Sequence, residues 1–175
     1  ALGTTTGADQ IVAIGNAAWG TGNKTSDADG SVFIGGYAGL SITSGIGNVV
    51  VGYEALDAAA TSDYNTAIGH QALSALTFDG DAQNTAVGYK AGFALTVNAQ
   101  RNTILGANAL ITDINGTRST AIGGQSLYSQ ESSGTSGVDT GNTACGFAAG
   151  YYNVTGTANT YLGAYAGVGA SGQSN

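Results

Sequence analysis

A nine-residue pattern centred on a glycine recurs nine times along this chain and sets the spacing of everything else. Two clear copies are Asn65 to Leu73 (NTAIGHQAL) and Asn84 to Gly92 (NTAVGYKAG). Successive central glycines lie 20, 17, 17, 19, 18, 17, 23 and 17 residues apart. A period of this size is typical of a stacked repeat, in which each copy packs mainly on its neighbours. The glycines are Gly15, Gly35, Gly52, Gly69, Gly88, Gly106, Gly123, Gly146 and Gly163.

The first five positions of each copy have the character of a short strand that ends in the glycine. Position one is usually Asn or Ser, position two is always Val or Thr, and position four is Ile, Val, Leu or Cys. Because strand side chains alternate between faces, we expect positions two and four to share one packed face. Position three ranges from Ala13 to Phe33 and Tyr161, so we expect it to be less confined. A glycine at position five in every copy indicates positive φ or the close approach of another backbone.

Positions eight and nine carry the second regular signal. Position eight is alanine in eight copies and serine in one, which leaves room for about one methyl group, while position nine is Leu, Gly or Trp. This predicts a second, shorter strand whose leucines help to fill the core. A core this narrow offsets little of the roughly 1.5 kcal/mol that ordering each residue costs. The alanine and glycine ladders therefore predict association of identical chains, as a parallel homotrimer or another homo-oligomer.

The repeat predicts an all-β fold, a β-solenoid or β-roll of about nine short coils forming a single repeat domain over residues 1–175. The stretches between copies, such as residues 21–30 and 130–141, are rich in Gly, Ser, Thr, Asn and Asp and vary in length. Loops of this kind bulge from one edge of a solenoid at little cost. A helical alternative is disfavoured, because glycine in every repeat costs about 1 kcal/mol per helical position.

Composition narrows the class of protein further. The 175 residues include 30 glycines, no proline and only 9% charged residues, which excludes collagen, while 42% hydrophobic residues argue against disorder. The net charge is −7, and the basic residues Lys24, Lys90, Arg101 and Arg118 are scattered. We therefore expect no nucleic-acid partner and no attraction to an anionic membrane. No run of 18 apolar residues occurs, so no membrane-inserted segment is expected.

Candidate catalytic groups are sparse, and we expect no enzymatic activity and no cofactor. Cys145 occupies the apolar fourth position of its copy and is interpreted as a buried small hydrophobe. His70 lies directly after a repeat glycine, in a chemically variable place, and is interpreted as a surface histidine. Paired aspartates in two loops could bind Ca²⁺ or cut glycosidic bonds, although solvated turns explain them better. These weak metal candidates are Asp27, Asp29, Asp79 and Asp81.

Aromatic side chains fall at or near the turn that follows each strand. Stacked coils would bring several of them onto one side, where ring faces pack on sugar C–H groups and neighbouring amides bind hydroxyls. Packing inside a trimer interface is the alternative and is favoured over contact with a glycan. The candidate ligand-binding residues are Trp19, Tyr37, Tyr53, Tyr89, Phe147 and Tyr165.

The segments at Asn65, Asn84 and Ser119 (STAIGGQSL) resemble the NTAIGYQAL-type repeats of bacteriophage tail fibres, which often lie upstream of a self-cleaving intramolecular chaperone domain. They are also similar to the head repeats of trimeric autotransporter adhesins. The resemblance covers residues 11–167 and implies a trimeric, β-rich fibre exposed outside a cell or on a virion. The repeats are longer and more irregular than those of the adhesin heads, and no chaperone domain is visible.

These observations predict a structural or attachment module of an extracellular or virion fibre that binds a host-surface carbohydrate or receptor. The first alternative is a self-assembling extracellular filament subunit without a receptor role. An ice-binding solenoid is suggested by the threonines from Thr66 to Thr160, although the paired position holds Ile, Val or Leu. A polysaccharide depolymerase is the remaining alternative.

Overall fold

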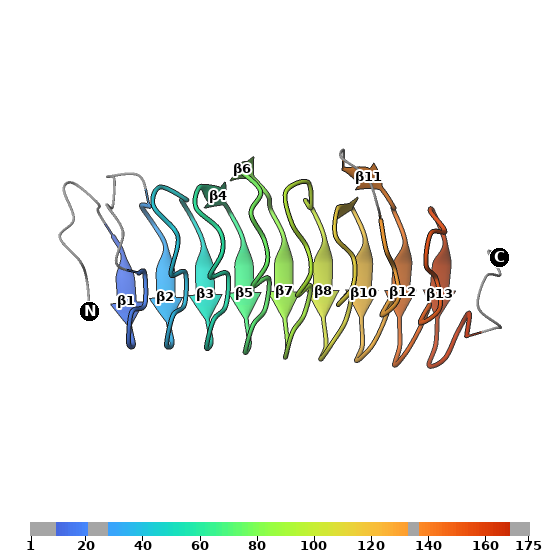
Figure 1. Ribbon diagram of the computed structural model, residues 1–175. Coiled ribbons are helices and arrows are strands. Elements are labelled where there is room, and N and C mark those ends of the chain that lie inside the picture. Colours follow the sequence, from blue (N-terminus) through green and yellow to red (C-terminus); the bar gives the residue numbers. More distant parts are fainter. Residues whose placement is uncertain (1–9, 21–27, 133–136, 169–175) are drawn as a thin grey trace.

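The central feature is a nine-stranded parallel sheet in which each copy of the repeat contributes one strand (Figure 1). The computed structural model describes residues 10–20, 28–132 and 137–168. The chain winds from one strand to the next in sequence order, so the strands stack along one axis as a β-solenoid. This confirms the predicted all-β repeat fold. The strands are β1 (Val12–Ile14), β2 (Val32–Ile34), β3 (Val49–Val51), β5 (Thr66–Ile68), β7 (Thr85–Val87), β8 (Thr103–Leu105), β10 (Thr120–Ile122), β12 (Thr143–Cys145) and β13 (Thr160–Leu162).

The repeat register is kept through the whole sheet. Position two always pairs with position two of the next coil, as Thr66 does with Thr85, and position four pairs with position four, as Ile68 does with Val87. Two small parallel sheets lie in the loops between coils. The first joins β4 (Ser62–Asp63) to β6 (Gly80–Asp81), and the second joins β9 (Gly116–Thr117) to β11 (Val138–Asp139).

The glycine at position five is required for both of the reasons that the sequence suggested. Its φ lies between 111° and 141° in all nine copies, a region that L side chains rarely adopt. A Cβ atom on Gly88 would also lie 2.7 Å from the carbonyl carbon and oxygen of Gly106 in the next coil. Each repeat glycine therefore turns the corner after its strand and lets the following coil stack directly on it.

At three further corners of each coil the backbone has the left-handed conformation (positive φ), mostly at residues other than glycine. Positions seven and nine have positive φ in every copy, as at Gln71 (57°) and Leu73 (52°). The residue before position one does too, as at Tyr64 (56°). Such residues cannot continue a strand, so the predicted second strand is wrong and positions six to nine form turns. The leucines at position nine still fill the core: Leu56, Leu73, Leu110 and Leu127 are fully buried.

The two faces of the sheet are reversed relative to the sequence-based expectation. Position three points into the solenoid and is fully buried at Phe33, Val50, Ala67 and Ile104, while positions two and four point outward. The alanines at position eight are also internal in seven of the nine coils. The alanine and glycine ladders are thus contacts between coils of one chain, and they do not form the surface for association that we expected. The space beside these alanines and glycines is filled by neighbouring coils of the same chain.

Core volume explains why position three varies so widely. Where it is large, a glycine at position nine in the same or an adjacent coil makes room. A Cβ atom on Gly39 would lie 2.4 Å from the Phe33 ring, and one on Gly92 would lie 2.7 Å from Ile104 Cδ1. Protein interiors are close-packed, so the two positions share a fixed volume. The size variation at position three therefore marks a core position, compensated by position nine.

A ladder of buried asparagines holds position one of successive coils together. The Asn48 Oδ1 atom accepts the backbone N–H of Asn65 at 2.9 Å, and the Asn65 Oδ1 atom accepts that of Asn84 at 3.1 Å. The Asn84 side chain receives the N–H of Asn102 at 3.0 Å and donates to the carbonyl of Ala99 at 3.0 Å. Buried amides are stable only when paired in this way, which explains the preference for Asn at position one.

The ladder continues where serine stands at position one. The Ser31 hydroxyl accepts the N–H of Asn48 at 3.0 Å. The Ser119 hydroxyl instead bonds to that of Thr140, and the buried Gln130 side chain links it to Asn142. The Gln130 Nε2 atom donates to Ser119 Oγ at 3.1 Å and to Asp113 Oδ2 at 2.6 Å, while its Oε1 atom accepts from Asn142 at 2.7 Å. The buried Asp113 carboxylate also accepts the backbone N–H groups of Gly116 and Ser132. The polar interior is thus continuous despite the substitution.

Candidate binding surfaces

The outward-pointing strand positions form one uncharged surface along the solenoid, which we call the outer strand face. None of its members is buried, and Ile14 (59%), Leu105 (48%) and Leu162 (79%) are strongly exposed. Nine strands about 4.8 Å apart and three residues long give a strip of roughly 400 Å². The largest apolar patch of an ordinary monomer is of this size and is often functional. The outer strand face consists of Val12, Ile14, Val32, Ile34, Val49, Val51, Thr66, Ile68, Thr85, Val87, Thr103, Leu105, Thr120, Ile122, Thr143, Cys145, Thr160 and Leu162.

Position two is threonine in the later coils, and these threonines stand in register. Thr66, Thr85, Thr103, Thr120 and Thr143 pair in succession from β5 to β12. Cys145 lies on the same face and is partly exposed, so the expectation that it is buried is wrong. The reason is that the two faces of the sheet are reversed relative to the expectation, so position four of each copy points outward.

Beside this face, three exposed rings at position six form the aromatic row, made of Tyr53, His70 and Tyr89. The Tyr53 and His70 ring centroids are 5.3 Å apart in a stacked arrangement, and those of His70 and Tyr89 are 5.5 Å apart. The Tyr37 ring meets Tyr53 edge-on at 5.7 Å. The rings at the same position of neighbouring coils are thus in direct contact. His70, which was not among the candidate ligand-binding residues, is part of this row.

Charged and amide groups at position seven line the aromatic row. The Gln71 Nε2 atom donates to Glu54 Oε2 at 2.8 Å, and Lys90 Nζ lies 5.6 Å from the centre of the Tyr89 ring. The pKa of the Tyr53 phenol is raised, mainly by its hydrogen bond to Glu54 and by the charge of that carboxylate. The row therefore offers rings flanked by one carboxylate, one amide and one ammonium group.

A second group of rings lines an open hollow near the last coils, which we call the aromatic cleft. Phe147 and Tyr165 meet edge-on at 5.4 Å, and Tyr151 and Tyr152 meet edge-on at 4.8 Å. The Gln125 side chain completes the wall, and the hollow measures about 330 Å³. No charged side chain is among the residues that line it.

The coil geometry explains how the aromatic cleft is built. Phe147 and Tyr165 stand at positions six and seven of the last two coils, where the backbone turns outward after the repeat glycine. Tyr151 follows position nine and stacks on Tyr128 of the preceding coil at 4.8 Å. The pKa of Tyr151 is raised by burial, with Tyr128 and Tyr152 adding to the effect, so its phenol stays protonated at neutral pH.

The predicted ligand-binding residues separate into three groups. Tyr53 and Tyr89 belong to the aromatic row with Tyr37 beside it, while Phe147 and Tyr165 belong to the aromatic cleft. Trp19 is instead fully buried and stacks on Phe33, so it is a core residue and presents no ring to the surface. Tyr151 and Tyr152 were missed, because they follow the nine-residue pattern. The adjacent pair of tyrosines after Gly150 was the available signal.

The aspartates considered as metal ligands do not converge. Asp27 lies outside the described residues, and Asp29, Asp79 and Asp81 are exposed. Asp79 accepts the hydroxyl of Thr61, and Asp81 pairs across the β4–β6 ladder with Asp63. Burial raises the pKa of Asp63, and the Asp81 charge adds to it, whereas the Ile46 N–H opposes the rise. Within the described ranges, no group of three or more metal-ligating side chains occurs.

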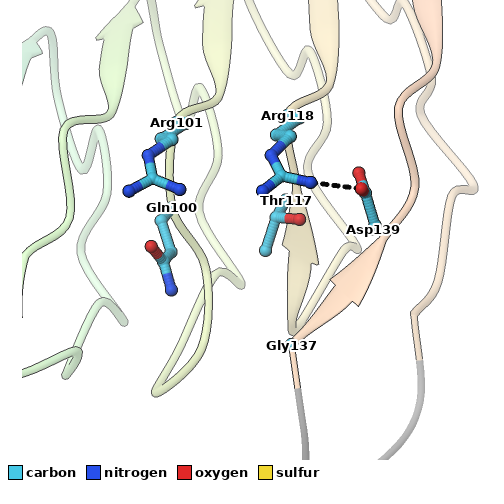
Figure 2. Close-up of a pocket in the computed structure, with 6 residues that line it drawn as sticks. All are labelled: Gln100, Arg101, Thr117, Arg118, Gly137 and Asp139. Atoms are coloured by element: carbon cyan, nitrogen blue, oxygen red, sulfur yellow. Dashed lines mark hydrogen bonds and ion pairs between the residues drawn. The ribbon is translucent and has the colours of Figure 1, made fainter.

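Two of the four basic residues lie on adjoining coils, in the polar cleft drawn in Figure 2. The Arg118 guanidinium donates to Asp139, and both side chains are more than half exposed, so this ion pair adds less than about 1 kcal/mol. Arg101 Nε lies 3.4 Å from Gln83 Oε1. The cleft measures about 250 Å³ and already contains the balancing carboxylate of Arg118.

Comparison with protein-family models, with curated proteins and with solved structures gave no match. Across the described part of the chain, no helix is long and apolar enough to span a bilayer.

Proposed function

We propose that this chain is an attachment module of an extracellular or virion fibre, in which identical chains associate through the outer strand face as a homotrimer. The observation that carries the proposal is the uncharged outer strand face itself, which runs through all nine coils without a buried or charged member. The resemblance of the repeats to phage tail-fibre and adhesin-head repeats is consistent with it. The aromatic cleft is the surface that such a fibre would present to a host glycan.

Physical chemistry favours association over exposure of this face. A parallel sheet is usually covered on both faces, and here the described residues cover only the inner one. Valine, isoleucine and leucine occupy the outward fourth position in eight of nine coils, and burying such side chains contributes about 1.5–3 kcal/mol each. Threonine beside them tolerates burial when its hydroxyl is hydrogen-bonded, so the whole strip suits a packed interface.

The test is the mass of the intact chain in solution, measured by sedimentation equilibrium at micromolar concentration. We expect three times the chain mass of 17.1 kDa for the natural sequence. The double variant Ile68→Asp/Val87→Asp places charges on the outer strand face and should give single chains with an unchanged circular dichroism spectrum. Val97→Asp is the matched control, because Val97 is 53% exposed but lies off that face.

A single-chain mass for the natural sequence would refute the association proposal. Equal dissociation by Val97→Asp would show that the outer strand face is not the interface.

The filament alternative is favoured by one observation at the last coil. A Cβ atom on Gly163 would meet nothing within 4 Å, and Asn159 Nδ2 is buried without a hydrogen-bond partner in the described ranges. Among the described residues nothing covers the Gly163 end of the stack, so a further coil could pack on β13. Negative-stain images of the isolated chain would support this alternative if they showed end-to-end polymers.

A further inference from the structure

The aromatic cleft is an open hollow that combines several exposed rings with hydrogen-bonding groups and carries no charge among its lining residues. Two edge-on ring pairs line about 330 Å³, at the lower end of the size range of ligand sites. The polar cleft at Arg118 has no aromatic wall, and the aromatic row is an open surface.

The chemistry of the wall selects one class of ligand. Phe147 (48%), Tyr152 (45%) and Tyr165 (61%) leave ring surface exposed, which favours an apolar or C–H-rich partner. Three phenol hydroxyls and the Gln125 amide can both donate and accept hydrogen bonds, so they match hydroxyl groups. An ionic ligand would find no opposite charge among the lining residues and would lose its hydration without compensation.

The ring pairs also restrict the shape of the ligand. Phe147 lies at 74° to Tyr165, and Tyr151 lies at 76° to Tyr152, so each pair offers a ring face beside a ring edge. A saturated six-membered ring with C–H groups on its faces and hydroxyls on its rim meets both surfaces at once. The stacking of Tyr151 on Tyr128 at 4.8 Å, with the planes 4° apart, fixes one wall before any ligand arrives.

We propose that the aromatic cleft binds a neutral pyranose unit of a glycan, with the rings of Phe147, Tyr152 and Tyr165 against its C–H faces and the Gln125 amide on its hydroxyls. This inference rests on the attachment function proposed above and names its ligand class and site. The cleft lies on the last coils, where the chain of a polysaccharide could enter from solvent on the open side.

The experiment is affinity electrophoresis of the full chain in gels containing one neutral polysaccharide at a time: dextran, mannan or galactan. We expect retardation by at least one of them. Tyr165→Ala and Tyr152→Ala should each weaken binding about tenfold, because a lost ring contact of 0.5–1.5 kcal/mol adds to lost buried area. Tyr165→Phe keeps the ring and should stay within about threefold.

Two controls fix the location and exclude an interface. Tyr53→Ala and Tyr89→Ala remove rings of similar exposure (45% and 49%) from the aromatic row and should leave retardation unchanged. Sedimentation of Tyr165→Ala should give the same mass as the natural chain, so loss of glycan binding is separated from loss of association.

Four outcomes would overturn the proposal. They are no retardation by any of the three polymers, equal weakening by Tyr53→Ala, unchanged retardation of both cleft variants, and dissociation of the Tyr165→Ala assembly. Competition by tetramethylammonium chloride at low millimolar concentration would identify a cation cage instead and would equally refute a sugar site. An intact mass with no glycan binding would overturn this site while leaving the association proposal standing.

Discussion

The inner and outer faces of the nine-stranded sheet are built from neighbouring residues of the same three-residue strands, yet they obey different rules. The inner face takes Phe33, Val50 or Ala67 and adjusts position nine to keep the packed volume constant. The outer face hardly varies: Val or Thr is followed two residues later by Ile, Val, Leu or Cys. The inner face is constrained by total volume and the outer face by uniform shape.

This difference teaches how to interpret repetition. A core shared by adjoining coils can trade size between positions three and nine, because these side chains fill the same interior volume. A surface that must remain flat across nine coils cannot make such trades. Uniformity along a solenoid is therefore evidence for contact with something flat and external, while compensated variation is evidence for an internal core.

Placing a charge on each face in turn should give the largest contrast. Ala86 is fully buried, and Ala86→Asp would bury an unpaired carboxylate, which we expect to cost more than about 4 kcal/mol or prevent folding. Thr85→Asp, one residue away on the outer strand face, should weaken association but change the free energy of unfolding of the single chain by less than about 1 kcal/mol. Urea unfolding followed by circular dichroism measures both. Similar losses in the two variants would contradict the assignment of the faces.

Two glycine variants separate coil contact from backbone strain. Gly88→Ala would meet the carbonyl of Gly106 at 2.7 Å and also strain φ, so we expect a loss of about 3–5 kcal/mol. Gly163→Ala has a similar backbone strain, with φ of 111°, but no atom within 4 Å of the new Cβ. Its loss should be about 1–2 kcal/mol. Equal shifts of the thermal unfolding temperature in the two variants would show that the close stacking of coils adds nothing to stability.

The smallest expected effect concerns acidic groups beside the sheet. Burial raises the pKa of Asp57, although the Ser74 hydroxyl donates to it at 2.6 Å and opposes the rise, and burial also raises the pKa of Asp63. A folded-state pKa above the unfolded value means that the folded chain binds the proton more tightly. The resulting stabilisation is fully present below the unfolded pKa near 4 and is lost as pH rises through the folded pKa.

Thermal unfolding between pH 4 and pH 7 tests this sign. The double variant Asp57→Asn/Asp63→Asn should lose part of the pH dependence and be relatively more stable at pH 7. A natural chain that gains stability from these two groups as pH rises would contradict the prediction.

Much of the architecture could be predicted, because some backbone conformations can be adopted by only one type of residue. The glycine at position five meets a need that no other residue satisfies, so its recurrence gave the coil, the corner and the close stacking. The orientation of the strands could not be predicted in the same way. Alternation says that Thr66 and Ile68 share a face opposite Ala67, but not which face is internal. The link between Phe33 and Gly39 would have decided it.

The binding surfaces were only partly predictable for a similar reason. Tyr53 and Tyr89 occur at one repeat position, so stacking brings them together by rule. Tyr151 and Tyr152 stand after the repeat, where coil length varies, and their position relative to Tyr165 depends on how that loop folds back. Trp19 fits position nine, and only the size of the neighbouring core positions reveals that it is internal.

The asparagine ladder gives the stack a direction. Wherever asparagine stands at position one, its side-chain oxygen accepts the main-chain N–H of the next coil's position one, as Asn48 does from Asn65 and Asn142 does from Asn159. One terminus of the row therefore offers acceptors and the opposite one donors. Any copy joined to the free Asn159 carboxamide must arrive head to tail, since an inverted copy would set acceptor against acceptor. Growth along this axis, wherever it occurs, is vectorial.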